Sequence, residues 1–344
     1  MNYKILQEKY KRCCQLVIDK QLYEAFIVLK ELVMESKKGD LLVQWERDQE
    51  TYQNILKYSF GEVEDPQKKP VYYHLLRSVL ELADETREAI ISAKQLSGYW
   101  HIKQNPENKL SVLPEEVKPF IDSLKWNPSS SKTNKSNDDK TELYLRERHK
   151  KIVHLFNILW LNDKYQESET ELATLAIMSD NLPWWDQCLV VSALTLSLQR
   201  HFDETKINLL LEAYNNKEEQ VWQRALTGLL MSLYQYNKRL FLYPKIKEKL
   251  EALHSSSKIS KHTEAIILQF IKARDTEKIA KHFRDEIVPE MSRIQSRIYD
   301  KLDMKNLIQD QFSEDKNPDW EHVFNDAPDL ANKLEELSRL QMDG

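Results

Sequence analysis

Apolar residues recur at helical spacing along most of this 344-residue chain. Over residues 3–18 and again over 25–33, apolar side chains are three or four positions apart, as on one face of an α-helix. Asp19, Lys20 and Gln21 interrupt the pattern between these runs. The pattern therefore predicts a helical hairpin at the start of the chain.

The same spacing predicts a succession of helices separated by polar or proline-containing segments. We expect them over residues 41–57, 72–83, 86–96, 114–126, 142–161, 165–178, 184–198, 203–214, 217–236, 243–253, 262–283, 289–301 and 327–340. The pattern fails from Gly98 to Pro114, where we expect irregular structure with a short strand pair around Tyr99 to Val112.

Residues 127–141 read NPSSSKTNKSNDDKT, which is too polar to bury and is typical of a linker. This segment divides the chain into an N-terminal helical lobe (1–126), a polar linker (127–141) and a helical repeat lobe (142–299). Residues 300–344 form a fourth part, an acidic helical segment with twelve acidic and five basic side chains.

Two of the predicted hairpin turns are alike, DKQLYEA at residues 19–25 and NDKYQES at residues 162–168. Both resemble the turn of a tetratricopeptide repeat. Leu22 aligns with Tyr165 and the small Ala25 with Ser168, and a small residue at this point lets two helices approach closely. A duplicated three-helix unit explains the match, and so do two unrelated amphipathic hairpins that share common residue types.

Residues 185–194 and 222–231 form a second similar pair, and each opens a long predicted helix that a shorter one follows. The second run, with Val221 and Arg224, resembles the first helix of a HEAT repeat. Both resemblances imply an all-α fold, an α-α superhelix or solenoid of stacked helical hairpins.

The repeat pattern also predicts core positions. We expect burial of Leu29, Leu32, Leu172, Leu175, Leu189, Ala193, Leu226, Leu229 and Leu230. Gly228 is expected within a helix where another helix passes closely.

Glycine is scarce, with five residues where average usage of about 7% would give roughly 24. A P-loop, a dinucleotide-binding loop and a nucleophile elbow all need closely spaced glycines, and the chain has none. We expect no cofactor and no metal: His149 and His154 are five apart, which turns them to different faces, and Cys13 and Cys14 lack a CxxC partner.

The net charge of −5 gives no general attraction to nucleic acid. No run of about 18 uncharged apolar residues predicts a membrane span. The three cysteines do not form a disulfide framework, and the chain does not open with a signal-peptide pattern, so we expect a cytoplasmic protein.

Surface candidates are aromatic or basic. Trp184, Trp185 and Trp222 stand near helix starts and could form a shelf that binds a protein partner, although tryptophans at such positions often pack beneath a loop. A further aromatic group is expected in the core between helices: Tyr234, Tyr236, Phe241 and Tyr243. A solvated helix face is expected, in preference to a phosphate-binding surface for nucleic acid, for the basic stretch of Lys238, Arg239, Lys245, Lys247, Lys249, Lys258 and Lys261.

Together these features predict a non-catalytic scaffold for protein partners. The alternative is an all-helical glycosylase of the HEAT-like type, which would use Trp184, Trp185 and Asp186 on a flipped base. The repeats followed by the acidic segment 317–341 resemble the N-terminal part of large bacterial tetratricopeptide-containing proteins of no assigned chemistry. That resemblance implies further repeats beyond Gly344, which would cover the apolar seam of Leu330, Leu334, Leu337 and Leu340.

Overall fold

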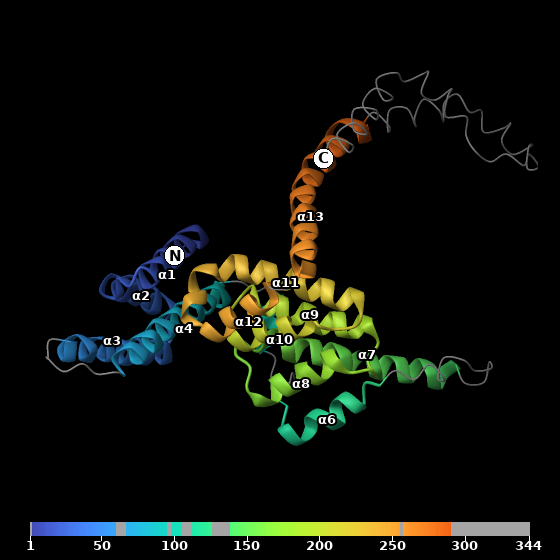
Figure 1. Cartoon of the computed structure of the whole chain (residues 1–344), viewed down its shortest axis with the longest axis horizontal. Helices are drawn as coiled ribbons and strands as arrows, with labels where there is room; N and C mark the ends of the chain where they lie inside the picture. Colours follow the sequence, from blue (N-terminus) through green and yellow to red (C-terminus); the bar gives the residue numbers. More distant parts are fainter. Residues whose placement is uncertain are drawn as a thin grey trace, which may run out of the picture. The chain divides into compact units, whose positions relative to one another are not determined.

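Every regular element of the described chain is a helix, which confirms the all-α fold (Figure 1). The computed structural model describes residues 2–59, 67–94, 98–104, 112–125, 138–254 and 257–289. The predicted seam of leucines near the C-terminus lies outside the described residues. None of the described helices has a long enough apolar run to cross a lipid bilayer.

Tertiary contacts divide the chain into two compact units, Met1–Ser256 and Ser257–Gly344. The first unit has twelve described α-helices and a 3₁₀ turn: α1 (Tyr3–Ile18), α2 (Leu22–Ser36), α3 (Gly39–Ser59), α4 (Lys68–Lys94), α5 (Gly98–Gln104), α6 (Pro114–Asp122), α7 (Asp138–Leu161), α8 (Glu167–Met178), α9 (Trp184–Leu198), α10 (Glu204–Ala213), α11 (Glu219–Tyr236), η2 (Asn237–Leu242) and α12 (Pro244–His254). In the second unit, α13 (Ser257–His282) runs into a π-helical turn, η3 (Phe283–Ile287).

The helices from α7 to α12 pack in two layers. In one layer α9 lies between α7 and α11, and in the other α10 lies between α8 and α12 (Figure 1). Successive helix pairs produce this order when each pair stacks on the one before. The layer of α7, α9 and α11 carries the surface that is described below as a candidate site.

The contact between α9 and α11 depends on Gly228. This glycine is buried in the middle of α11, and a Cβ atom there would overlap Oγ1 of Thr195 on α9. The prediction that Gly228 lies within a helix where another helix passes closely is confirmed. Of the predicted core residues, six are buried, Leu175 and Leu230 are half-buried, and Leu189 is exposed. The prediction that Leu189 lies in the core is wrong.

The N-terminal helices pack around α2, which contacts α1, α3 and α4. Leu22 and Ala25 at the start of α2 are fully buried, as the tetratricopeptide-like turn predicts. The second turn of this type differs in its packing, because α7 packs mainly on α9 and only lightly on α8. The two hairpins therefore have similar turn sequences but differ in how their helices pack.

Two segments that the sequence predicts to lie outside helices, Asp84–Glu85 and Gly98–Gln104, are helical. The sequence predicts separate helices over 72–83 and 86–96, but α4 continues through Asp84 and Glu85. Asp84 is fully buried in an ion pair and so does not end the helix. The predicted strand pair is also wrong where it can be tested, because Gly98–Gln104 is the helix α5, in which Tyr99 is buried against Leu161.

The predicted linker lies largely outside the described residues, and its last four residues belong to α7. The unit that ends at Ser256 contains parts of both predicted lobes. Contacts between α4 and η2 and the ion pair between Asp84 and Arg239 join these two parts.

Candidate functional site

The three candidate tryptophans belong to two ring pairs. Trp184 and Trp185 begin α9, are exposed, and contact each other edge to face with ring centroids 5.6 Å apart. Trp222 in the first turns of α11 makes a similar contact, 6.0 Å, with Tyr214 at the end of α10. Of the three, Trp185 lines a groove.

This groove runs between α7 and α9 and has a volume of about 560 Å³. Leu145 and Val153 of α7 form one wall, while Trp185 and Leu189 of α9 form the other, and all four side chains are exposed. Ile152 of α7 lines the groove between the walls and is buried. The groove is thus an apolar channel on the surface of the α7–α9–α11 layer, which we call the α7/α9 groove.

The polar part of the α7/α9 groove consists of the exposed His149 of α7 and a buried ion pair. Arg148 of α7 pairs with Asp186 in the first turn of α9, and its Nε donates to the Leu124 carbonyl oxygen at 3.1 Å. Both charged side chains are buried. Because the two charges are already paired with each other, an apolar ligand would not have to cover an unpaired charge of this pair.

The exposure of Leu189 follows from the composition of α9. This helix is apolar around its whole circumference, so its sequence does not show which stripe faces the core. Val190, Val191 and Leu194 are buried, whereas Leu189 and Leu196 are 42% and 44% exposed. Only the packing of α7 and α11 on either side of α9 decides that Leu189 points outward.

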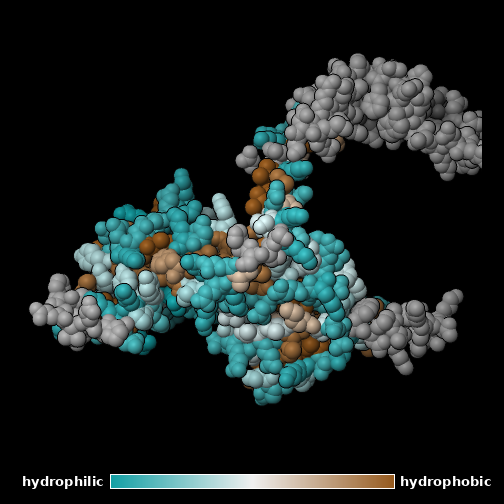
Figure 2. Space-filling view, viewed as in Figure 1, coloured by the Kyte–Doolittle hydropathy of each residue, from teal (hydrophilic) through white to brown (hydrophobic). Residues whose placement is uncertain are grey.

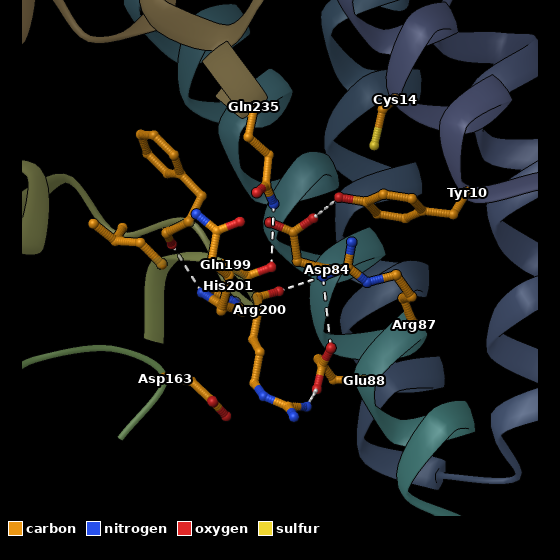
Figure 3. Close-up of polar contacts among 12 residues, drawn as sticks. Tyr10, Cys14, Asp84, Arg87, Glu88, Asp163, Gln199, Arg200, His201 and Gln235 are labelled. Atoms are coloured by element: carbon orange, nitrogen blue, oxygen red, sulfur yellow. Dashed lines mark hydrogen bonds and ion pairs between the residues drawn. The ribbon is translucent and has the colours of Figure 1, made fainter. Parts of the chain in front are cut away.

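A second polar cluster, which we call the junction, lies in the interior between α1, α4 and η2. Arg239 of η2 donates from Nη1 and Nη2 to the two carboxylate oxygens of Asp84 at 2.7 and 2.9 Å. Tyr10 of α1 donates to Asp84 Oδ1 at 2.5 Å (Figure 3). Arg239 Nη2 also lies 3.3 Å from the Cys14 sulfur. The basic stretch predicted as a solvated face therefore has one buried member.

The electrostatics of the junction favour the ionised pair. Burial alone would raise the pKa of Asp84, but the charge and hydrogen bonds of Arg239 outweigh it and hold that pKa well below its usual range. Burial and the Asp84 charge raise the pKa of Tyr10, so that its hydroxyl stays protonated and donates. Asp84 thus stays charged and Tyr10 neutral near neutral pH.

Further polar contacts extend the junction toward the turn between α9 and α10. Arg87 donates to the Arg200 carbonyl oxygen, and Glu88 lies 3.6 Å from both guanidinium groups (Figure 3). The Arg200 guanidinium stacks 3.6 Å above the Tyr99 ring. These contacts join α4 and α5 to the turn between α9 and α10.

Lys206 of α10 is a fully buried lysine at the turn after α7. Its Nζ donates to the carbonyl oxygens of Asn162 and Asp163 at 2.7 and 2.5 Å and to Ser197 Oγ at 3.0 Å. Burial lowers its pKa to about 8. By donating to these carbonyl oxygens, the Lys206 ammonium group stabilises the turn that follows the C-terminus of α7.

The remaining sequence candidates do not form a chemical site. His154 packs on the ring of Phe120, and Cys13 and Cys14 are buried thiols whose pKa values are raised by burial. No three His, Cys, Asp or Glu side chains converge as a metal would require within the part of the chain that the structure describes.

The aromatic group predicted for the core is divided. Tyr236 and Tyr243 are buried on either side of Phe202, at centroid distances of 5.1 and 4.6 Å. Tyr234 is 86% exposed and Phe241 is also exposed, so the prediction is wrong for these two. Tyr234 lies on the solvent-exposed face of α11, and Phe241 lies on that of η2.

Comparisons with protein families, with curated proteins and with solved structures find no match to this chain. The geometry of the described residues is therefore the basis for a functional proposal.

Proposed function

We propose that this chain is a non-catalytic, protein-binding helical module and that the α7/α9 groove is its binding surface. The exposed apolar walls of the groove carry the proposal. Leu145, Val153, Trp185 and Leu189 together offer an apolar channel that water solvates poorly. Figure 2 shows such apolar patches on an otherwise hydrophilic surface.

The chemistry of the groove supports a protein ligand. Its two walls come from α7 and α9, two neighbouring helices that pack directly on each other, so the channel is formed before any partner binds. Tryptophan, which Trp185 supplies here, is among the residues at which protein interfaces concentrate binding energy. The internally neutral Arg148–Asp186 pair adds no charge that an apolar partner must match.

The position of Asp186 does not favour the glycosylase alternative. A base-excising site needs a carboxylate that faces the ligand beside the tryptophans. Asp186 is buried and directed toward Arg148 instead.

The test compares two leucines of one helix. Leu189→Glu places a charge in the groove, while Leu196→Glu makes the same change at equal exposure outside the groove lining. We expect proteins recovered with the wild-type chain, and with Leu196→Glu, to be depleted about tenfold or more with Leu189→Glu. Quantitative mass spectrometry measures the ratio.

Thermal unfolding of both variants must stay close to that of the wild type, because both side chains are exposed to a similar extent at the surface of α9. Equal recovery of every protein by the two variants would contradict the proposal.

A further inference from the structure

A second apolar groove lies between α2 and α3, in the N-terminal part of the first unit. Its volume is about 640 Å³. Tyr23, Ile27 and Met34 form the α2 wall at spacings of four and seven residues, so they share one helix face, and all three are exposed. Trp45 and Leu56 stand in the α3 wall.

The floor of this groove is a fixed aromatic cluster. The Trp45 indole donates from Nε1 to the Phe26 carbonyl oxygen at 3.1 Å. The Phe26 ring contacts Trp45 and Tyr52 at centroid distances of 6.2 and 5.7 Å. A partner would therefore meet a preformed surface and would not have to order it on binding.

Of the two charged side chains in the lining, Glu31 forms an ion pair within the residues that the structure describes and Lys30 does not. Glu31 pairs with Lys9 of α1 at 2.7 Å, which leaves its charge matched within the chain. Lys30 lies 4.9 Å above the Trp45 ring, and no carboxylate among the described residues lies within ion-pair distance of it. Gln49 and Gln53, one turn apart on α3, also line the groove, and their side-chain amides make no hydrogen bond within the described part of the chain. The groove thus offers one unmatched cation and two amides.

We propose that the α2/α3 groove binds an amphipathic helical segment of another protein, with apolar residues at positions i, i+4 and i+7 and an acidic residue that meets Lys30. From Tyr23 to Met34 the α2 wall is about 16 Å long, which matches three turns of a bound helix. The carboxylate of the partner pairs with the Lys30 ammonium. The side-chain amides of Gln49 and Gln53 form hydrogen bonds with polar groups of the bound helix. A second copy of this chain is the competing occupant, and the sedimentation measurement below separates it from a helical segment of another protein.

This groove is separate from the α7/α9 groove, and its partner differs in kind. Arg148 and Asp186 of the α7/α9 lining are paired with each other, whereas the α2/α3 lining has an unmatched cation. A chain with both grooves would hold two different partners at once.

The experiment selects ligands from a displayed library of random peptides about 16 residues long, which is roughly 24 Å of helix. The wild-type chain and Lys30→Glu are used as parallel targets. The wild type is expected to enrich peptides with the i, i+4, i+7 apolar pattern and an acidic residue, and Lys30→Glu is expected to enrich a basic residue at the same position. Fluorescence anisotropy should show that wild-type-selected peptides bind about tenfold more weakly to Lys30→Glu and to Ile27→Glu.

Val43→Glu is the matched control, because Val43 is an exposed residue of α3 outside the groove lining. It should leave the affinity unchanged, as should Leu189→Glu in the other groove. The proposal is overturned if no peptide family is enriched, if the enriched peptides carry no acidic preference, or if Ile27→Glu binds them as well as the wild type. It is also overturned if sedimentation shows a wild-type dimer that Ile27→Glu dissociates, since the occupant is then a second copy.

Discussion

The two buried arginine–aspartate pairs of this chain have different surroundings. Asp84 and Arg239 are enclosed by α1, α4 and η2, and Tyr10 donates to the same carboxylate. Arg148 and Asp186 are also buried, but they lie beneath the open α7/α9 groove. The partners of the first pair are 155 residues apart in sequence, against 38 for the second.

We infer from these different surroundings that the Asp84–Arg239 pair stabilises the fold, whereas the Arg148–Asp186 pair contributes to a binding surface. The enclosed pair joins the N-terminal helices α1 and α4 to η2, which follows α11, so its loss should loosen the whole first unit. The pair beneath the groove cancels two charges locally and leaves an apolar surface above it. A similar ion pair thus stabilises the fold in one place and shapes a binding surface in the other.

The largest expected effect comes from breaking the enclosed pair. Arg239→Met leaves the Asp84 charge buried without a partner, which should lower the free energy of unfolding by about 3–5 kcal/mol. Arg148→Met should cost less, because Asp186 lies in the first turn of α9, where the helix dipole stabilises a lone carboxylate. Urea unfolding of the two variants measures the difference. Equal losses would mean that the surroundings of the two pairs do not matter.

Acid should remove much of the same stabilisation. The pKa of Asp84 is lower in the folded chain than its unfolded value of about 3.9. The unfolded state therefore takes up this proton first, and the contribution of Asp84 is complete above that pH and lost as the pH falls further. The difference in unfolding free energy between the wild type and Asp84→Asn should be constant near pH 6 and shrink below about pH 4. A difference that does not change with pH would show that Asp84 is not charged in the folded chain.

A smaller effect is expected where α9, the helix that carries Asp186, contacts α11. Gly228→Ala forces a Cβ atom against Thr195 Oγ1 and should cost about 1–3 kcal/mol. Thr195→Ala removes that atom, so adding Gly228→Ala to a Thr195→Ala background should cost much less. Chemical denaturation of the four chains forms a double-mutant cycle. Simple additivity would contradict the close approach at this glycine.

Much of the fold could be predicted from the spacing of apolar residues. The helix α9 begins and ends at the predicted residues, Trp184 and Leu198, because a proline precedes it and polar residues follow it. The errors occur where tertiary contacts reverse a local signal. Asp84 and Glu85 are typical of a break between helices, but Arg239 stabilises the Asp84 charge inside a continuous α4. The local sequence contains no sign of a partner so distant along the chain.

The candidate site was only partly predictable for a similar reason. Trp185 attracts notice as one of two adjacent tryptophans at a helix start, and it does line the groove. Leu189 has the composition of a core residue, and only the neighbours of α9 expose it. The α2/α3 groove has no sequence signature, because Ile27 and Met34 continue an apolar helix whose other face is the core.

The central claim, that the α7/α9 groove binds a protein, is tested most directly by photo-cross-linking from within the groove. A photoreactive phenylalanine analogue is placed at position 189 in one chain and at position 196 in another, on the same helix and at nearly the same exposure. The account predicts that position 189 cross-links the proteins that Leu189→Glu fails to recover, and that position 196 does not. Cross-linking of those proteins from position 196 and not from position 189 would contradict it.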